Sequence, residues 1–107
     1  MRVAIVGQGY VGLPLAVAAA EAGHTVIGID TDAARVGLLN HGTSPVADIS
    51  DSALTSVIQS GNYQASNSFA GVATSDVICI CVPTPLNQDR QPDLSAFEAA
   101  IEAVGAN

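Results

Sequence analysis

The 107-residue sequence contains no lysine and only three arginines, Arg2, Arg35 and Arg90, against ten acidic residues, which gives a net charge of −7. Proteins that bind nucleic acid or anionic lipid surfaces neutralise phosphates with clustered lysine and arginine side chains. We therefore expect no nucleic-acid partner and no membrane partner. A single phosphate-bearing small molecule is not excluded, because backbone N–H groups can bind phosphate without cationic side chains.

Cysteines, histidines and long apolar runs are also scarce. Cys79 and Cys81 are the only cysteines, and on a strand they would point to the same face and pack as small apolar groups. His24 and His41 stand alone, so we expect no metal site. No stretch is long enough to span a membrane, and no basic segment leads into a long apolar one at the start. These absences favour a cytoplasmic protein without disulfides.

What the sequence does contain is an alternation of short apolar runs and helix-forming stretches. With 49% apolar and 12% charged residues, it suits a sheet that is buried on both faces. The pattern predicts strands at residues 2–6, 25–29, 63–66 and 77–82, the last fully buried. It predicts helices at residues 10–22, at 32–39 after a Thr31 cap, and at 53–59 after a Ser50 or Asp51 cap. A helical turn at 69–73 and a final helix beginning near Ser95 complete the prediction.

Three glycines stand where the first strand is expected to become a helix. Gly7, Gly9 and Gly12 fit G-x-G-x-x-G. The first allows a tight turn, the second lets a pyrophosphate approach the backbone, and the third lets the helix lie close to the strand. The start of the helix offers unpaired N–H groups to a diphosphate. The prediction is an α/β, Rossmann-like, partial doubly wound parallel sheet of order 3-2-1-4 with helices on both faces.

An acidic residue closes the second predicted strand. Asp30 lies 18 residues after Gly12, close to the spacing of about 20 expected for a carboxylate that binds the ribose of a dinucleotide. The same carboxylate would repel the extra phosphate of NADP, so we expect NAD as cofactor. The alternative is that Asp30 only caps the helix that follows.

Beyond these patterns, the stretches GQGYVGLPLA, VIGID and VICICVPTPL with QPDLS resemble the N-terminal domain of the UDP-glucose/GDP-mannose dehydrogenase family, the nucleotide-sugar 6-dehydrogenases. The resemblance runs over essentially all 107 residues. It implies an NAD-dependent oxidation of a sugar 6-hydroxyl to a carboxylate, in two hydride transfers and with a cysteine nucleophile. It implies cofactor-binding roles for a set of eight residues: Gly7, Gly9, Tyr10, Val11, Gly12, Asp30, Arg35 and Thr84.

Family members also have a second half of this domain, a helical middle domain and a C-terminal domain, where the catalytic residues lie. The resemblance therefore implies that residues 1–107 are an NAD-binding domain cut from a longer enzyme, not catalytic by itself and homo-oligomeric when intact. Neither Cys79 nor Cys81 is the expected nucleophile. The stretch SPVADISDSAL is more similar to the branch that oxidises UDP-N-acetylhexosamines, such as UDP-N-acetylmannosamine.

Three other functions remain open from the sequence. A regulatory NAD-sensing module and the first domain of a hydroxy-acid dehydrogenase both begin with a strand, a glycine motif and an acid. The V-P-T-P loop followed by P-D-L-S argues against the regulatory module. The third alternative is a structural fragment that binds nothing.

Overall fold

The computed structural model describes residues 1–81, 102, 104 and 105. Its elements, in chain order, are β1 (Arg2–Val6), α1 (Gly12–Glu21), β2 (Thr25–Ile29), α2 (Ala33–Asn40), α3 (Asp51–Gln59), β3 (Tyr63–Ser66), the short 3₁₀ helix η1 (Ala70–Thr74) and β4 (Val77–Ile80). Residues 102, 104 and 105 are helical. Most of the predicted final helix lies outside the described residues.

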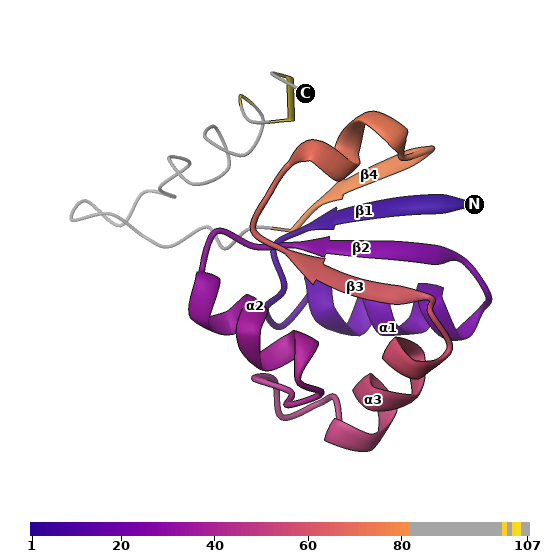
Figure 1. Ribbon diagram of the computed structural model, residues 1–107, viewed down its shortest axis with the longest axis vertical. Coiled ribbons are helices and arrows are strands. Elements are labelled where there is room, and N and C mark those ends of the chain that lie inside the picture. The colour runs from indigo at the N-terminus through magenta and orange to yellow at the C-terminus, as the bar shows by residue number, and fades with distance from the viewer. Residues whose placement is uncertain (82–101, 103, 106–107) are drawn as a thin grey trace.

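The four strands form one parallel sheet in the order β3-β2-β1-β4, as the sequence predicted (Figure 1). β1 lies in the interior of the sheet, with Ile5 beside Gly28 of β2 and beside Cys79 of β4. Since all strands are parallel, the carboxyl ends of β1, β2 and β3 lie at the same end of the sheet. The glycine motif and Asp30 both follow strand ends, so the sheet brings them together at this end.

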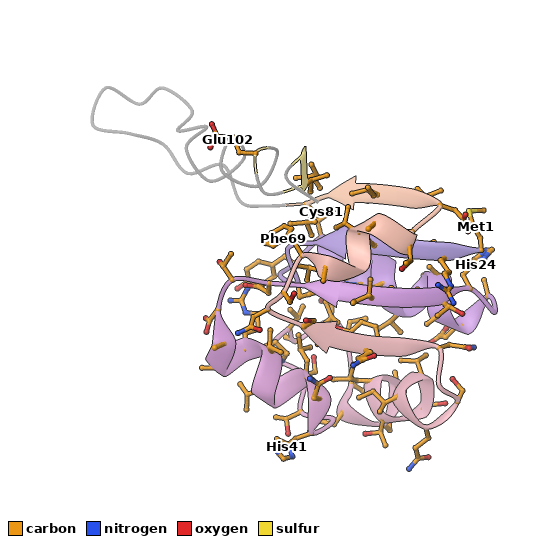
Figure 2. All side chains as sticks on the ribbon, turned by 45° about the horizontal axis from the view of Figure 1, so that its top comes forward. Met1, His24, His41, Phe69, Cys81 and Glu102 are labelled. Atoms are coloured by element: carbon orange, nitrogen blue, oxygen red, sulfur yellow. The ribbon has the colours of Figure 1, made fainter. Side chains whose placement is uncertain are left out.

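Among the described residues, the helices α1, α2 and α3 cover one face of the sheet, and η1 packs on the other. Side chains along each strand alternate between these two faces. On one face, Val3 and Ile5 of β1 belong to a core cluster that also contains Leu13 of α1, Leu39 of α2 and Leu54 of α3. On the other face lies a second cluster, which consists of Ala4, Val6, Ile29 and Val72, with Val104 against it. Figure 2 shows η1, which carries Val72, crossing in front of the strands.

β4 differs from its prediction as a fully buried strand. It ends at Ile80, and Val77 and Ile78 are 40% and 38% exposed. The reason is that β4 pairs only with β1 within the described residues, so its other side has no described neighbour. The predicted packing role of the cysteines is confirmed, since Cys79 and Cys81 both pack against the first core cluster.

The helix caps show one wrong prediction and one correct one. Asp32, not Thr31, caps α2, with its carboxylate accepting hydrogen bonds from the N–H groups of Ala34 and Arg35. Ser50 caps α3 through a hydrogen bond from the N–H of Ala53. Among the described residues, no helix has the length and apolar character needed to cross a membrane.

Candidate functional site

The turn between β1 and α1 depends on two glycines for reasons internal to the chain. Gly7 has a φ of +94°, which side-chain-bearing residues rarely adopt, and its N–H donates a 2.7 Å hydrogen bond to the carbonyl of Ile29. A Cβ on Gly12 would lie only 1.6 Å from the carbonyl oxygen of Gly7. Glycine at position 12 therefore allows α1 to begin directly against the turn.

Gly9 has no comparable internal reason to be glycine. A Cβ there would meet Arg35 Nη1 at 3.6 Å, an ordinary van der Waals contact, and Gly9 does not have a positive φ. Tyr10 and Val11, which follow it, are exposed large apolar residues. No side chain caps α1 at Val11, and the first N–H groups of a helix have no partner within it. Among the described residues, only Arg35 comes within 4 Å of a Cβ built on Gly9, so this surface offers N–H donors and room for a ligand.

Asp30 faces this turn from the end of β2. Its Oδ2 accepts a 2.9 Å hydrogen bond from the N–H of Gln8, and its Oδ1 accepts one of 3.0 Å from the N–H of Asp32. Its own N–H donates to the carbonyl of Ser66 in β3. Since Asp32 is the cap of α2, the alternative role of Asp30 as that cap is wrong.

Arg35 lies beside the same carboxylate. Its Nη1 is 3.5 Å from Asp30 Oδ2, and the two side chains are 38% and 11% exposed. A long, partly exposed ion pair of this kind contributes little to stability, at most about 1 kcal/mol. Its position between Asp30 and Gly9 matters more, because it places a cation next to the open surface at Gly9.

Gln8 and Tyr63 belong to the site but were missed in the sequence. Gln8 is fully buried, and its Nε2 donates to the carbonyls of Ile5 and Gly7 at 3.0 and 3.1 Å. Its Oε1 accepts a 2.8 Å hydrogen bond from the hydroxyl of Tyr63. Burial, and to a lesser extent the negative charge of Asp30, raises the pKa of Tyr63 well above its usual range, so the hydroxyl stays protonated.

One signal in the sequence could have indicated this pair. Gly28 stands in the middle of β2, where a glycine often marks the close approach of another group. A Cβ there would lie 2.4 Å from Gln8 Oε1 and 2.7 Å from the Tyr63 hydroxyl.

Cys81 also lies near the turn, at the carboxyl end of the sheet. Met1 and His24 lie at the other end of the strands (Figure 2). Its N–H donates to the carbonyl of Val6, and its Cβ lies 3.4 Å from the position of a Cβ on Gly12. Burial, with a smaller effect of Cys79, raises the pKa of the Cys81 thiol. A protonated thiol is a poor nucleophile, which agrees with a packing role.

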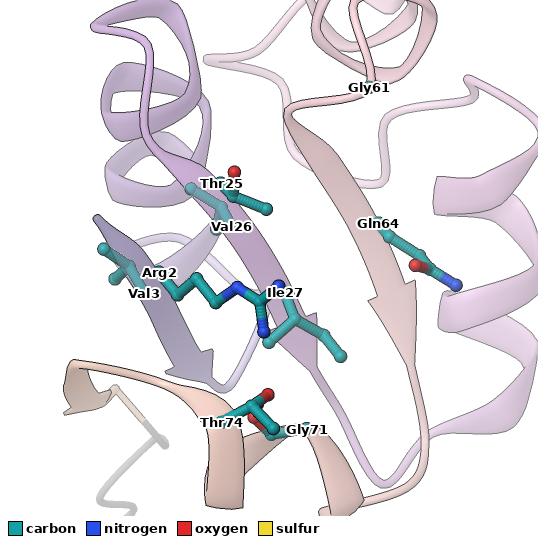
Figure 3. A pocket seen from close by; sticks show the side chains of 9 residues that line it. All are labelled: Arg2, Val3, Thr25, Val26, Ile27, Gly61, Gln64, Gly71 and Thr74. Atoms are coloured by element: carbon teal, nitrogen blue, oxygen red, sulfur yellow. The ribbon is translucent and has the colours of Figure 1, made fainter.

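The structure does not add further residues to this site. Thr84 lies outside the described residues, and no group of three or more potential metal ligands is found within them. A hollow of about 180 Å³ lies near the start of the strands, between β1, β2, β3 and η1, with Arg2, Thr25 and Thr74 among its lining residues (Figure 3). None of the seven predicted site residues that the structure describes lines it. The candidate site is therefore the turn at the opposite end of the strands.

This arrangement of turn, helix start and strand-end carboxylate agrees with the comparisons with known proteins. The family model for the NAD binding domain of the UDP-glucose/GDP-mannose dehydrogenase family matches residues 1–107. The chain belongs to this family. The match confirms the predicted family and NAD as its cofactor, and it disfavours the regulatory module and the hydroxy-acid dehydrogenase.

Individual members of the family are similar over almost the whole chain. The UDP-N-acetyl-D-mannosamine dehydrogenase of Pyrococcus horikoshii is 36% identical over 105 residues, which cover 97% of this chain and 25% of the relative. A crystal structure of a ternary complex of GDP-mannose dehydrogenase from Pseudomonas aeruginosa aligns with a TM-score of 0.94 and 34% identity, over 98% of this chain and 24% of that one. The structure of a UDP-glucose dehydrogenase from Pyrobaculum islandicum aligns with a TM-score of 0.89 and 35% identity, over 97% of this chain and 24% of that one. The chain thus spans about a quarter of the length of these dehydrogenases.

Proposed function

We propose that the turn between β1 and α1 holds NAD. The N–H groups of Tyr10 and Val11 bind the diphosphate over Gly9, and Asp30 accepts hydrogen bonds from the hydroxyls of the adenosine ribose. The observation that carries this proposal is the direction of the Asp30 side chain. It faces the turn and accepts a hydrogen bond from the backbone N–H of Gln8. Gly9 fits the same role, because no described residue comes close enough to require glycine there.

Two further side chains complete the proposed site. Arg35, 3.5 Å from Asp30, lies next to the ribose and offers its guanidinium as a hydrogen-bond donor. Thr84, which follows β4 in the sequence, is the other residue that we assign to the cofactor. The Asp30 carboxylate favours a free ribose 2′-hydroxyl and disfavours the 2′-phosphate of NADP, so the site prefers NAD.

For the whole protein we propose oxidation of the 6-hydroxyl of a nucleotide sugar to a carboxylate. NAD, when bound, supplies the hydride acceptor. The residues of this chain hold and orient that cofactor, while the catalytic cysteine belongs to the domains that follow in the family. The family match and the 24–25% coverage of full dehydrogenases support this division of roles.

UDP-N-acetylmannosamine is the proposed substrate, supported by the stretch from Ser44 to Leu54 and by 36% identity to a dehydrogenase named for that sugar. A GDP-mannose 6-dehydrogenase is 35% identical, so a test must offer several sugars. We place the reaction in the cytoplasm, in polysaccharide biosynthesis, with the whole enzyme as a homo-oligomer.

Two experiments test the proposal. Calorimetric titration of this chain with NAD and with NADP should show binding of NAD and a preference of at least about tenfold over NADP. Equal binding of the two, or no binding of NAD, contradicts the proposed cofactor role. For the reaction, the chain joined to the rest of its enzyme should form NADH with UDP-N-acetylmannosamine and not with GDP-mannose or UDP-glucose. NADH formation with another sugar alone would contradict the proposed substrate.

A further inference from the structure

The peptide between Gly7 and Gln8 is held from both sides. Its N–H donates to Asp30 Oδ2 at 2.9 Å, and its carbonyl oxygen accepts from Gln8 Nε2 at 3.1 Å. The same carbonyl oxygen is the atom that a Cβ on Gly12 would strike. The orientation of this single peptide therefore sets both the direction of the Asp30 carboxylate and the approach of α1 to β1.

The side chain of Gln8 controls that orientation, and its own amide can face only one way. Nε2 lies against two carbonyl oxygens, of Ile5 and Gly7, which can only accept hydrogen bonds. Oε1 consequently faces the Tyr63 hydroxyl, which donates to it at 2.8 Å. Every polar atom of this fully buried amide has a partner, and Tyr63 supplies the only donor to Oε1 in the described part of the chain.

The space for this contact exists because Gly28 has no side chain. A Cβ on Gly28 would overlap both Gln8 Oε1 and the Tyr63 hydroxyl. Tyr63 is the first residue of β3 and lies 55 positions after Gln8 in the sequence. The contact therefore joins the edge strand β3 to the turn that follows the inner strand β1. A chain of hydrogen bonds thus runs from Tyr63 through Gln8 to Asp30.

We propose that Tyr63 is a positioning residue for the NAD site, acting through Gln8. By binding the side-chain amide of Gln8, Tyr63 fixes the orientation of the Gly7–Gln8 peptide. The N–H of that peptide then holds the Asp30 carboxylate in the direction that binds the ribose. This inference rests on the proposed function, because the positioned groups are those assigned there to NAD.

A purely structural role makes a different prediction. If the Tyr63 hydroxyl only stabilised the fold, its loss would lower stability and leave the affinity of the folded protein for NAD unchanged. Tyr63→Phe separates the two roles, since it removes the hydroxyl and keeps the ring. Asn40→Ala is the matched control, because the Asn40 side chain makes two hydrogen bonds to Ala65 of the same strand, at 3.0 and 3.1 Å.

The experiment measures NAD affinity by calorimetry and the hydrogen exchange of the backbone N–H of Gln8 by NMR. Both are measured at a temperature where each variant is folded. In Tyr63→Phe we expect on the order of tenfold weaker NAD binding, as for the loss of a supporting hydrogen bond at other ligand sites, and faster exchange of the Gln8 amide. Asn40→Ala should change neither. Wild-type affinity in Tyr63→Phe, or an equal loss in both variants, overturns the inference.

A second variant tests the route through Gln8. Gln8→Met keeps the length of the side chain and removes its amide, so it should weaken NAD binding as Tyr63→Phe does. Combining the two should add nothing further, whereas additive losses contradict the proposed route. If wild-type protein binds NAD but Tyr63→Phe binds equally well, the inference alone fails. If wild type binds no NAD, the proposed function fails, and the Gln8 amide exchange still shows whether Tyr63 holds the peptide.

Discussion

The backbone N–H of Gln8 donates a 2.9 Å hydrogen bond to Oδ2 of Asp30, which joins the turn after β1 to the end of β2. The two residues are 22 positions apart, and the parallel pairing of β1 with β2 brings them together. A negative group that faces the start of a helix at a strand end fits a ligand with ribose hydroxyls next to a diphosphate.

The first prediction concerns the Asp30 carboxylate. Asp30→Ala should weaken NAD binding about 10- to 100-fold, because hydrogen bonds from the ribose to a charged acceptor are lost. Calorimetric titration measures the change. Asp48→Ala is the control, since Asp48 is an exposed acid in the loop before α3. If both variants bind NAD as wild type does, Asp30 has no role in cofactor binding.

The second prediction separates Gly9 from Gly12. Gly12→Ala should lower the free energy of unfolding by at least about 3 kcal/mol, because its Cβ would overlap the Gly7 carbonyl. Gly9→Ala should change stability by less than about 0.5 kcal/mol and still weaken NAD binding at least about tenfold. Urea denaturation and calorimetry measure the two effects. Wild-type affinity in Gly9→Ala would show that the surface over Gly9 is not occupied by the ligand.

The third prediction concerns the gap at Gly28. Gly28→Ala should destabilise the protein by about 1–3 kcal/mol, since the new methyl group overlaps Gln8 and Tyr63. Adding Gln8→Ala should restore part of that loss by removing the overlapping amide. Thermal denaturation of the three variants measures this coupling. Purely additive losses would mean that Gly28 and Gln8 do not share this space.

The fourth prediction is a pH dependence of stability at alkaline pH. The pKa of Tyr63 is raised in the folded state above its ordinary value of 10.0, by burial first and by Asp30 second. The unfolded chain therefore loses the Tyr63 proton at a lower pH than the folded protein does. The contribution of protonated Tyr63 to the free energy of unfolding is fully present below about pH 10 and falls as the pH rises further. Above pH 10, wild-type stability should decline more steeply than that of Tyr63→Phe. Urea midpoints between pH 8 and 11 measure the difference, and parallel declines would contradict a buried, protonated Tyr63.

Much of the site geometry was accessible from the sequence because it depends on local rules. Gly7, Gly12 and Asp30 follow from the ends of two strands and the start of one helix, and each has a steric or electrostatic reason that spacing reveals. The parallel order followed from the alternation of strands and helices. Ser50 was one of the two caps predicted for α3, with Asp51, because a hydroxyl stands just before a helix-forming run.

The parts that could not be predicted depend on contacts far apart in the chain or on fine competition between neighbours. Gln8 occupies a variable position of the glycine motif, and its partner Tyr63 lies 55 residues away, so local pattern does not link them. Thr31 and Asp32 are adjacent and both suit a helix cap, and the helix begins one residue later than expected. The exposure of Val77 and Ile78 depends on what pairs with the far side of β4, which an apolar run does not show.

The central claim is that NAD occupies the turn between β1 and α1, and an NMR titration of this chain with NAD tests it most directly. We predict that the largest amide shifts lie at residues 9–12 and 30–35, with small shifts around the hollow near Arg2 and Thr25. Shifts centred on that hollow, or none at residues 9–12 and 30 at saturating NAD, would contradict the account.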